Sequence, residues 1–222
     1  MVANPQTLFS THHAHAFWSD DLADLATIYE PDINVCLVKR QISPVIDRFV
    51  HSLLASPLDV AFVENIEPPL FDFLRLISKA EHLPGYGEFC QDVALLTAAF
   101  SDLFGLKRVG LRLRTLDHAM CPRFHVDSVT CRLVCTYGGA GTEWLEDAYI
   151  DRKKLGRASA GLKDEHSGLI LDADAVYQMQ AYAVGLLKGS AWEGNEQQGA
   201  VHRSPRISPT LPRRLLLTMD FG

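Results

Sequence analysis

The chain carries a cluster of metal-binding residue types in the stretch "CPRFHVDSVTCRLVC", residues 121–135. At its centre His125 and Asp127 are two residues apart, a spacing that fits neither one face of a helix nor a zinc finger. In an extended chain the side chains at positions i and i+2 leave the same face, so this pair can bind one metal ion. His125 and Asp127 are therefore the start of a candidate metal site.

His202, in the later motif "VHRSP", is the residue that could complete this site. Two imidazoles and one carboxylate on one face of a metal form the triad of non-haem Fe(II) oxygenases, which leaves coordination positions open for a cosubstrate and oxygen. Zinc and copper bind many such sites more tightly than iron does, so the three residues do not by themselves specify the ion. Arg213 and Arg214 begin the next strand-like segment.

The elements that must position these residues change in character near Leu106. Before this point, apolar residues recur at intervals of three and four, with Ser, Asp or Pro near the start of each segment, which predicts amphipathic helices. These predicted helices are residues 19–29, 43–56, 68–83 and 87–105. Residues 33–41 are the exception, because their clustered β-branched residues predict a short strand.

After Leu106 the sequence predicts strands, separated by glycine, proline, asparagine and aspartate. The predicted strands are residues 108–116, 128–137, 142–146, 182–189, 199–205 and 213–221. The polar residues 151–169 predict a surface loop, and residues 172–179 predict a short helix or an edge strand. Helices followed by closely spaced strands indicate an α+β chain whose strands form a sandwich or barrel.

The composition is that of a globular protein in a reducing compartment. The 222 residues are 47% hydrophobic and 22% charged, which is enough apolar material for a sizeable core. A net charge of −6 disfavours bulk binding of nucleic acid. The N-terminus lacks the pattern of a signal peptide, no run is long enough to span a bilayer, and the five cysteines fit reduced thiols better than disulfides. We therefore expect a cytoplasmic protein with neither nucleic acid nor a membrane as partner.

Five motifs resemble, in order, those of the Fe(II)/2-oxoglutarate-dependent dioxygenases. They are "HVD", "TYGGAGTEWL", "VGLLKG", "HRSP" and "RRLLLTMDF". They are similar to the metal strand, a glycine-turn strand, the strand before the second histidine, the distal histidine and the arginine strand of that superfamily. The run from "CPRFHVD" to "HRSP" also resembles an uncharacterised bacterial domain family of unknown function, whose members lie near zinc-homeostasis genes.

This resemblance implies a fold and a set of cofactors. The expected fold is a double-stranded β-helix, or jelly roll, over residues 106–222, with a mainly helical layer over residues 1–105 packed on it in a single domain. The expected cofactors are Fe(II), bound by His125, Asp127 and His202, and 2-oxoglutarate. The expected activity is the oxidation of a substrate, either a small molecule or a protein, that the motifs do not identify.

The resemblance also implies how 2-oxoglutarate is held. In these dioxygenases an arginine or lysine about ten residues after the distal histidine binds the far carboxylate, which points to Arg213 or Arg214. Adjacent strand residues face opposite ways, so only one of the two can enter the pocket. A guanidinium suits this role because it makes two parallel charge-assisted bonds to a carboxylate. Tyr137 is a further candidate for that carboxylate, with a core tyrosine as the alternative. Arg123 shares the alternating face of His125 and is a weaker candidate for an anionic substrate, with a rim charge as the alternative.

Two other functions would use the same three ligands: non-catalytic zinc handling, and a cupin-like binding module without redox chemistry. Cys121, Cys131 and Cys135 offer soft ligands for a structural zinc site. However, no CxxC pair is present, and residues 131 and 135 lie about 13 Å apart on a strand. Buried thiols that act as small hydrophobic side chains are the simpler interpretation. The histidines of "HHAH", residues 12–15, are another possible metal-binding group.

Overall fold

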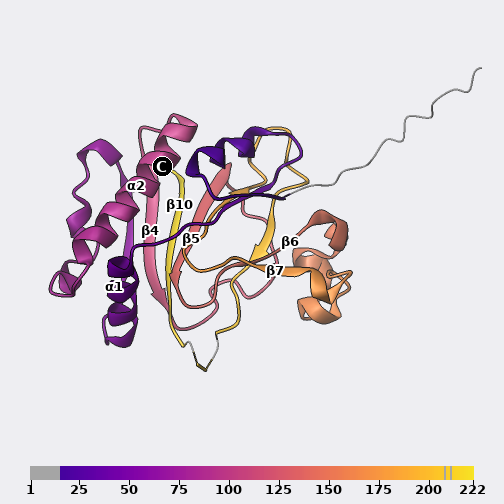
Figure 1. Cartoon of the computed structure of the whole chain (residues 1–222). Coiled ribbons are helices and arrows are strands. Elements are labelled where there is room, and N and C mark those ends of the chain that lie inside the picture. Colours follow the sequence, from indigo (N-terminus) through magenta and orange to yellow (C-terminus); the bar gives the residue numbers. More distant parts are fainter. Residues whose placement is uncertain (1–15, 208, 211) are drawn as a thin grey trace, which may run out of the picture.

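The computed structural model describes residues 16–207, 209–210 and 212–222, which form a mixed α+β structure with two sheets (Figure 1). The larger sheet has seven strands in the order β1-β2-β8-β5-β10-β4-β3, and the smaller has three in the order β7-β6-β9. All neighbouring strands are antiparallel except β1 and β2. The strands are β1 (Ala16–Ser19), β2 (Val35–Val38), β3 (Ala61–Ile66), β4 (Val109–Leu116), β5 (Cys131–Gly138), β6 (Glu143–Leu145), β7 (Val176–Gln178), β8 (Val184–Lys188), β9 (Val201–Arg203) and β10 (Arg214–Phe221).

Two α-helices, α1 (Pro44–Ala55) and α2 (Tyr86–Phe104), cover one face of the larger sheet (Figure 1). Helix α1 begins where the Ser43 side chain accepts a hydrogen bond from the main-chain N–H of Val45. Helix α2 ends at Gly105, whose φ of 61° lies in the left-handed region that favours glycine. The apolar faces of both helices pack with the sheet into the largest core of the protein.

The opposite face of the larger sheet packs against the smaller sheet. A second apolar cluster joins the two sheets and consists of Val35, Leu37, Val134, Trp144, Met179, Leu187 and Ala200. Side chains of a central strand therefore alternate between two environments. In β10, Leu215, Leu217 and Met219 face the helices. Leu216 and Thr218 face the other way and line a cavity on the side of the smaller sheet.

The N-terminal part of the chain contributes more strand than its sequence predicts. β1 and β3 were not predicted, and they form the two edges of the larger sheet. β2 lies inside the predicted strand 33–41 and pairs with β8. The larger sheet therefore contains strands from both residues 1–105 and residues 106–222. The predicted helix 19–29 is a 3-10 helix, Leu22–Tyr29, that begins at the side-chain cap Asp21.

The α-helix predicted over residues 68–83 is wrong. This segment forms three short 3-10 helices, Pro68–Leu70, Phe73–Arg75 and Ser78–Ala80. The hydroxyl of Tyr86 donates to the carbonyl of Leu74 at 2.7 Å and accepts from the N–H of Ile77 at 2.9 Å. These main-chain groups therefore bond to a tertiary partner instead of to a regular helical turn.

The strands predicted after residue 106 are all present, although most are shorter than predicted. Within residues 172–179, a 3-10 turn is followed by the edge strand β7. Residues 151–169 are an irregular segment with three short 3-10 helices. In the described part of the chain, no helix combines the length and the apolar character that crossing a bilayer requires.

A buried ion pair links the segment after β2 to α2. Arg40 donates to the two carboxylate oxygens of Asp92 at 2.8 and 3.1 Å, and the two side chains are 8% and 9% exposed. The hydroxyl of Tyr137, on β5, donates to the same carboxylate. Asp92 thus satisfies two buried groups that approach α2 from the sheet.

We predict that Asp92→Ala lowers the free energy of unfolding by about 3–5 kcal/mol, because it leaves the buried charge of Arg40 without its carboxylate partner. Urea unfolding followed by circular dichroism measures this change. The exposed neighbour Gln91 provides the control, since Gln91→Ala should change stability by no more than about 0.5 kcal/mol. A loss of less than about 1 kcal/mol in Asp92→Ala would show that this pair does not stabilise the helix on the sheet.

Candidate metal centre

His125, Asp127 and His202 come together on the side of the larger sheet that faces away from the helices. Their ligand atoms all lie within 4.8 Å of one another. The Nε2 atom of His125 is 3.4 Å from Oδ1 of Asp127, and the Nε2 atom of His202 is 3.2 Å from Oδ2. Metal bonds of about 2.1 Å that meet at 90–110° separate their donor atoms by about 3.0–3.4 Å. Among the described residues, no other group of three or more His, Cys, Asp or Glu side chains meets this criterion.

The two histidines are positioned by a main-chain bridge. The N–H of each donates to the carbonyl of the other at 3.0 Å, which makes His125 and His202 directly opposite residues of an antiparallel pair. Their chain neighbours Phe124 and Val201 are buried in a separate apolar cluster. Because strand side chains alternate, burying Phe124 and Val201 on one side turns both imidazoles to the other.

Each imidazole has its Nδ1 atom bonded to a main-chain carbonyl. Nδ1 of His125 lies 2.9 Å from the carbonyl oxygen of Arg123, and Nδ1 of His202 lies 3.1 Å from that of Ala200. A carbonyl only accepts, so Nδ1 carries the proton and Nε2 of a neutral ring has a free lone pair. Such outer hydrogen bonds fix the ring orientation and the tautomer of metal-binding histidines.

The main chain around Asp127 is held against the end of β8. The N–H of Ser190 donates to the carbonyl of Asp127 at 2.9 Å. A Cβ atom on Gly189 would lie 1.9 Å from the carbonyl oxygen of Val129 and 2.7 Å from that of Asp127. Only glycine therefore allows this close approach, which gives the glycine of "VGLLKG" a role in placing the carboxylate.

Arg132, on β5, orients the carboxylate of Asp127. Its Nη1 atom donates to Oδ2 of Asp127 at 2.6 Å, and its Nη2 atom donates to Asp220 on β10 at 2.9 Å. Burial alone would raise the pKa of Asp127, but hydrogen bonds from both histidines and the charge of Arg132 hold it well below its usual value. The carboxylate is therefore ionised, as a metal ligand must be.

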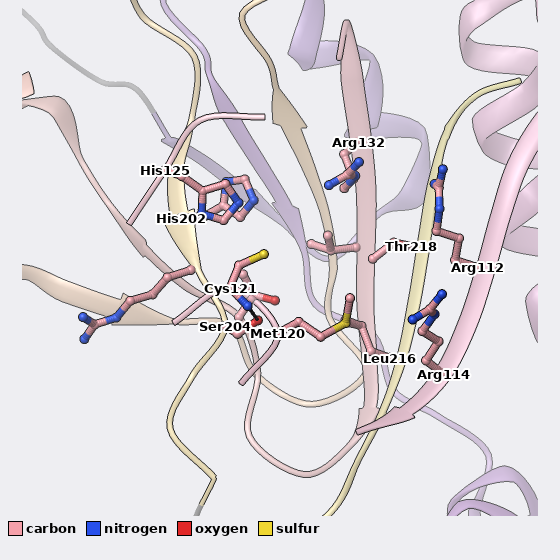
Figure 2. Close-up of a pocket in the computed structure, with 13 residues that line it drawn as sticks. Arg112, Arg114, Met120, Cys121, His125, Arg132, His202, Ser204, Leu216 and Thr218 are labelled. Carbon is pink, nitrogen blue, oxygen red and sulfur yellow. Dashed lines mark hydrogen bonds between the residues drawn. The ribbon is translucent and has the colours of Figure 1, made fainter. Parts of the chain in front are cut away.

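A cavity of about 310 Å³ opens beside the triad (Figure 2). It lies over β4, β5 and β10, and Figure 2 shows His125 and His202 on one side of it and Arg112 and Arg114 on the opposite side. Its lining residues are Arg112, Arg114, Met120, Cys121, His125, Arg132, Val134, Thr142, His202, Arg203, Ser204, Leu216 and Thr218. The cavity gives a small molecule access to the imidazole edge of the site.

The adjacent residues Arg213 and Arg214 have opposite surroundings. Arg213 donates to three main-chain carbonyls at the end of α1 and after it, at 3.2, 2.5 and 2.5 Å. Arg214 is fully buried and lies on the same face of β10 as Leu216, which lines the cavity. Its Nη2 atom donates to Thr136 at 3.3 Å, whereas Nε and Nη1 are buried without any hydrogen-bond partner. Burial lowers the pKa of Arg214 to about 10, although the charge of Glu143 opposes this shift.

Two of the candidate residues do not lie at the site. Tyr137 was a candidate for the cosubstrate carboxylate, but its odd-numbered position on β5 turns it toward the helices, where it is fully buried. Arg123 was a candidate for an anionic substrate, but its guanidinium bonds to Asp164 at 2.9 Å and to Ser159 at 2.6 Å. It therefore ties residues 151–169 to the strand of His125, and it does not line the cavity.

The alternative metal ligands are also placed elsewhere. Cys131 and Cys135 are buried in the helix-facing core, as expected of thiols that act as small hydrophobic side chains. Cys121 is exposed and lines the cavity, but it is not part of the metal-binding group. The histidines of "HHAH", residues 12–15, lie outside the described residues.

Three arginines at the site, Arg112, Arg114 and Arg132, were not identified from the sequence, although its pattern indicates them. Arg112 and Arg114 alternate along β4 with Leu111 and Leu113, which belong to the helix-facing core. Arg132 alternates with core residues of β5 in the same way. Arginine at every second position of a strand that is otherwise apolar indicates a polar inner face.

We predict that the protein binds one divalent ion per chain and that His202→Ala weakens this binding by more than about a hundred-fold, because one of only three protein ligands is lost. Calorimetric titration with Zn²⁺, supported by metal analysis, measures the affinity. His118→Ala is the matched control, since the side chain of His118 is 71% exposed and lies outside the triad. Equal affinities in both variants would mean that the ion binds elsewhere.

Comparisons with known proteins show which folds this chain resembles. The fold is similar to that of the rice dioxygenase for auxin oxidation (TM-score 0.50, 13% identity, covering 90% of this chain and 76% of that one). A second is the dioxygenase for auxin oxidation 1 of Arabidopsis thaliana in a binary complex with 2-oxoglutarate (TM-score 0.51, 10% identity, covering 90% and 86%). At these identities the similarity shows the fold alone, which this chain shares with the two dioxygenases.

The search of curated proteins gave no match. A family model described as "Protein of unknown function (DUF1826)" matches residues 19–220, which is nearly the whole chain. The matched region includes the triad, Arg213 and Arg214. The chain belongs to the DUF1826 family.

Proposed function

We propose that this protein is a non-haem Fe(II)- and 2-oxoglutarate-dependent oxygenase. The observation that carries the proposal is the convergence of His125, Asp127 and His202 at the edge of a cavity, with an ionised carboxylate that both Nε2 atoms face. Two imidazoles and one carboxylate are the ligand set of non-haem Fe(II) oxygenases. The dioxygenase fold supports the proposal.

The three ligands fit an Fe(II) ion, since their donor atoms are close together and their outer hydrogen bonds are already made. Iron bound there would supply the activation of O2, with one oxygen atom entering succinate as 2-oxoglutarate loses CO2 and the other entering the substrate. Arg132 keeps the Asp127 carboxylate in one orientation by occupying its Oδ2 atom. Oδ1 therefore remains for the metal.

Arg214 is the residue that we assign to the far carboxylate of 2-oxoglutarate. A buried guanidinium whose Nε and Nη1 atoms have no hydrogen-bond partner is costly, and charge-assisted bonds to a bound carboxylate would reduce this cost. Arg213 cannot take this role without losing its bonds to the main chain at the end of α1. The protein thus contributes an anion-binding group beyond the three metal ligands.

Arg214 also favours an oxygenase over the two alternatives that use the same triad. A zinc-handling protein needs ligands for the ion only, and a cupin-like module without redox chemistry needs no 2-oxo acid. Neither explains why an unpaired arginine is buried on the face of β10 that carries the cavity. Zinc handling is nevertheless a distinct outcome of the experiment below, since such ligands bind zinc well.

We predict that 2-oxoglutarate added to the Fe(II)-loaded protein without oxygen gives the weak visible charge-transfer band of the chelate, and that admitting O2 bleaches the band and yields succinate. Arg214→Gln should raise the dissociation constant for 2-oxoglutarate about ten- to a hundred-fold, because it removes a charge-assisted contact of about 1.5–3 kcal/mol. The titration of the band measures both the chelate and its affinity.

Arg213→Gln is the matched control and should leave the affinity for 2-oxoglutarate unchanged, since its side chain bonds to the end of α1. If iron-loaded wild-type protein forms neither the band nor succinate, and the purified protein holds stoichiometric zinc, the zinc-handling function replaces this one.

A further inference from the structure

The cavity beside the triad is strongly basic, although the chain as a whole has a net charge of −6. Four arginines line it, namely Arg112, Arg114, Arg132 and Arg203. In the part of the chain that the structure describes, no aspartate or glutamate is among the lining residues. Basic walls around a partly enclosed space concentrate positive potential and attract anions.

Three of these arginines are neutralised by carboxylates that lie behind the wall. Arg112 pairs with Asp220, Arg132 pairs with Asp127 and Asp220, and Arg203 pairs with Glu143, Asp164 and Glu165. The shortest contacts of these three arginines are 2.7, 2.6 and 2.6 Å. Their charges therefore stabilise the structure of the site and are partly neutralised by carboxylates of the protein.

Arg114 differs from the other three. In the described residues it has no carboxylate within ion-pair distance, and its Nε atom is buried without a hydrogen-bond partner. It projects from β4 directly opposite Leu216 of β10, and both residues line the cavity. Figure 2 shows Arg114 on the side of the cavity away from His125 and His202. Its charge is thus free to bind a ligand that also reaches the metal centre.

Arg114 and Arg214 offer two separate positions for anions. Arg214 of β10 pairs with Leu116 of β4, two residues after Arg114. The two arginines are therefore diagonal neighbours on one face of the sheet, with their Cα atoms about 7–8 Å apart. Arg214 is fully buried and is not among the cavity-lining residues, whereas Arg114 is partly exposed and lines the cavity. If 2-oxoglutarate occupies the deeper arginine, the outer one still lacks an anionic partner.

We propose that the substrate of this oxygenase is a small organic carboxylate whose charged group is bound by Arg114; this inference rests on the function proposed above. A single unpaired guanidinium matches one carboxylate, whereas a dianionic phosphate would need further donors that are already paired. The side chains of Met120, Val134 and Leu216 supply an apolar wall for the rest of the molecule. A cavity of about 310 Å³ fits a small molecule.

Ligand-observed NMR on metal-free protein tests the site independently of iron chemistry, with phenylacetate as the probe and phenylacetamide as its neutral match. Wild-type protein should bind the acid at least ten-fold more tightly than the amide. Arg114→Gln should weaken binding of phenylacetate about ten- to a hundred-fold and leave the amide unchanged. Arg114→Lys, which keeps the charge without the planar fork, should retain part of the preference. The exposed Arg48 on α1 provides the control Arg48→Gln, which should behave as wild type.

The affinity of Fe(II)-loaded Arg114→Gln for 2-oxoglutarate, measured without oxygen, separates this site from that of the cosubstrate and should equal that of wild type. Weaker binding of 2-oxoglutarate in Arg114→Gln would overturn the proposal, because Arg114 would then hold the cosubstrate. Equal binding of the acid and the amide to wild-type protein would overturn it as well. Tighter binding of phenyl phosphate than of phenylacetate would overturn the choice of a carboxylate.

Discussion

The main-chain bridge between His125 and His202 is the interaction on which the candidate metal centre depends. Two hydrogen bonds of 3.0 Å join residues that lie far apart in the sequence and make them direct neighbours in space. Burial of Phe124 and Val201 on one side of this bridge directs both imidazoles to the other. The same bridge connects the segment of Asp127 to the smaller sheet through β9. The two histidines are therefore held by backbone pairing, which is more rigid than a loop.

A second constraint is the division of the larger sheet into an apolar face and a basic face. Leucines of β4 and β10 fill the core under the helices, whereas arginines of β4, β5 and β10 point to the other side. Two of these four arginines are paired with carboxylates: Arg132 joins Asp127 to Asp220, which also binds Arg112. Arg114 and Arg214 are the members of this face with buried nitrogen atoms and no carboxylate partner among the described residues. Each therefore indicates a place for an external anion.

The sequence allowed the order of the elements and the three candidate ligands to be predicted, for physical reasons. Alternation of period two identifies strands, and His125 and Asp127 at i and i+2 must share a face. The pairing of the strands was harder to predict, because the neighbours of β10 are β4 and β5, which lie far earlier in the chain. For that reason Arg132 and Arg114 were not recognised, although their alternation with core residues was visible. The sequence left Tyr137 between the cosubstrate and the core, and its place on β5 puts it in the core. The helix predicted over residues 68–83 failed because Tyr86, outside the segment, bonds to its main chain.

The proposed function requires one ion that is held by His125, Asp127 and His202 and completed by a 2-oxo acid anchored on Arg214. A crystal structure of the protein grown without oxygen in the presence of Fe(II) and 2-oxoglutarate tests it most directly. The predicted result is an anomalous iron peak bonded to both Nε2 atoms and to Oδ1 of Asp127, with Oδ2 still bonded to Arg132 and the far carboxylate of 2-oxoglutarate on Arg214. Iron bound away from the triad, or an Arg214 guanidinium with no contact to the 2-oxo acid, would contradict it.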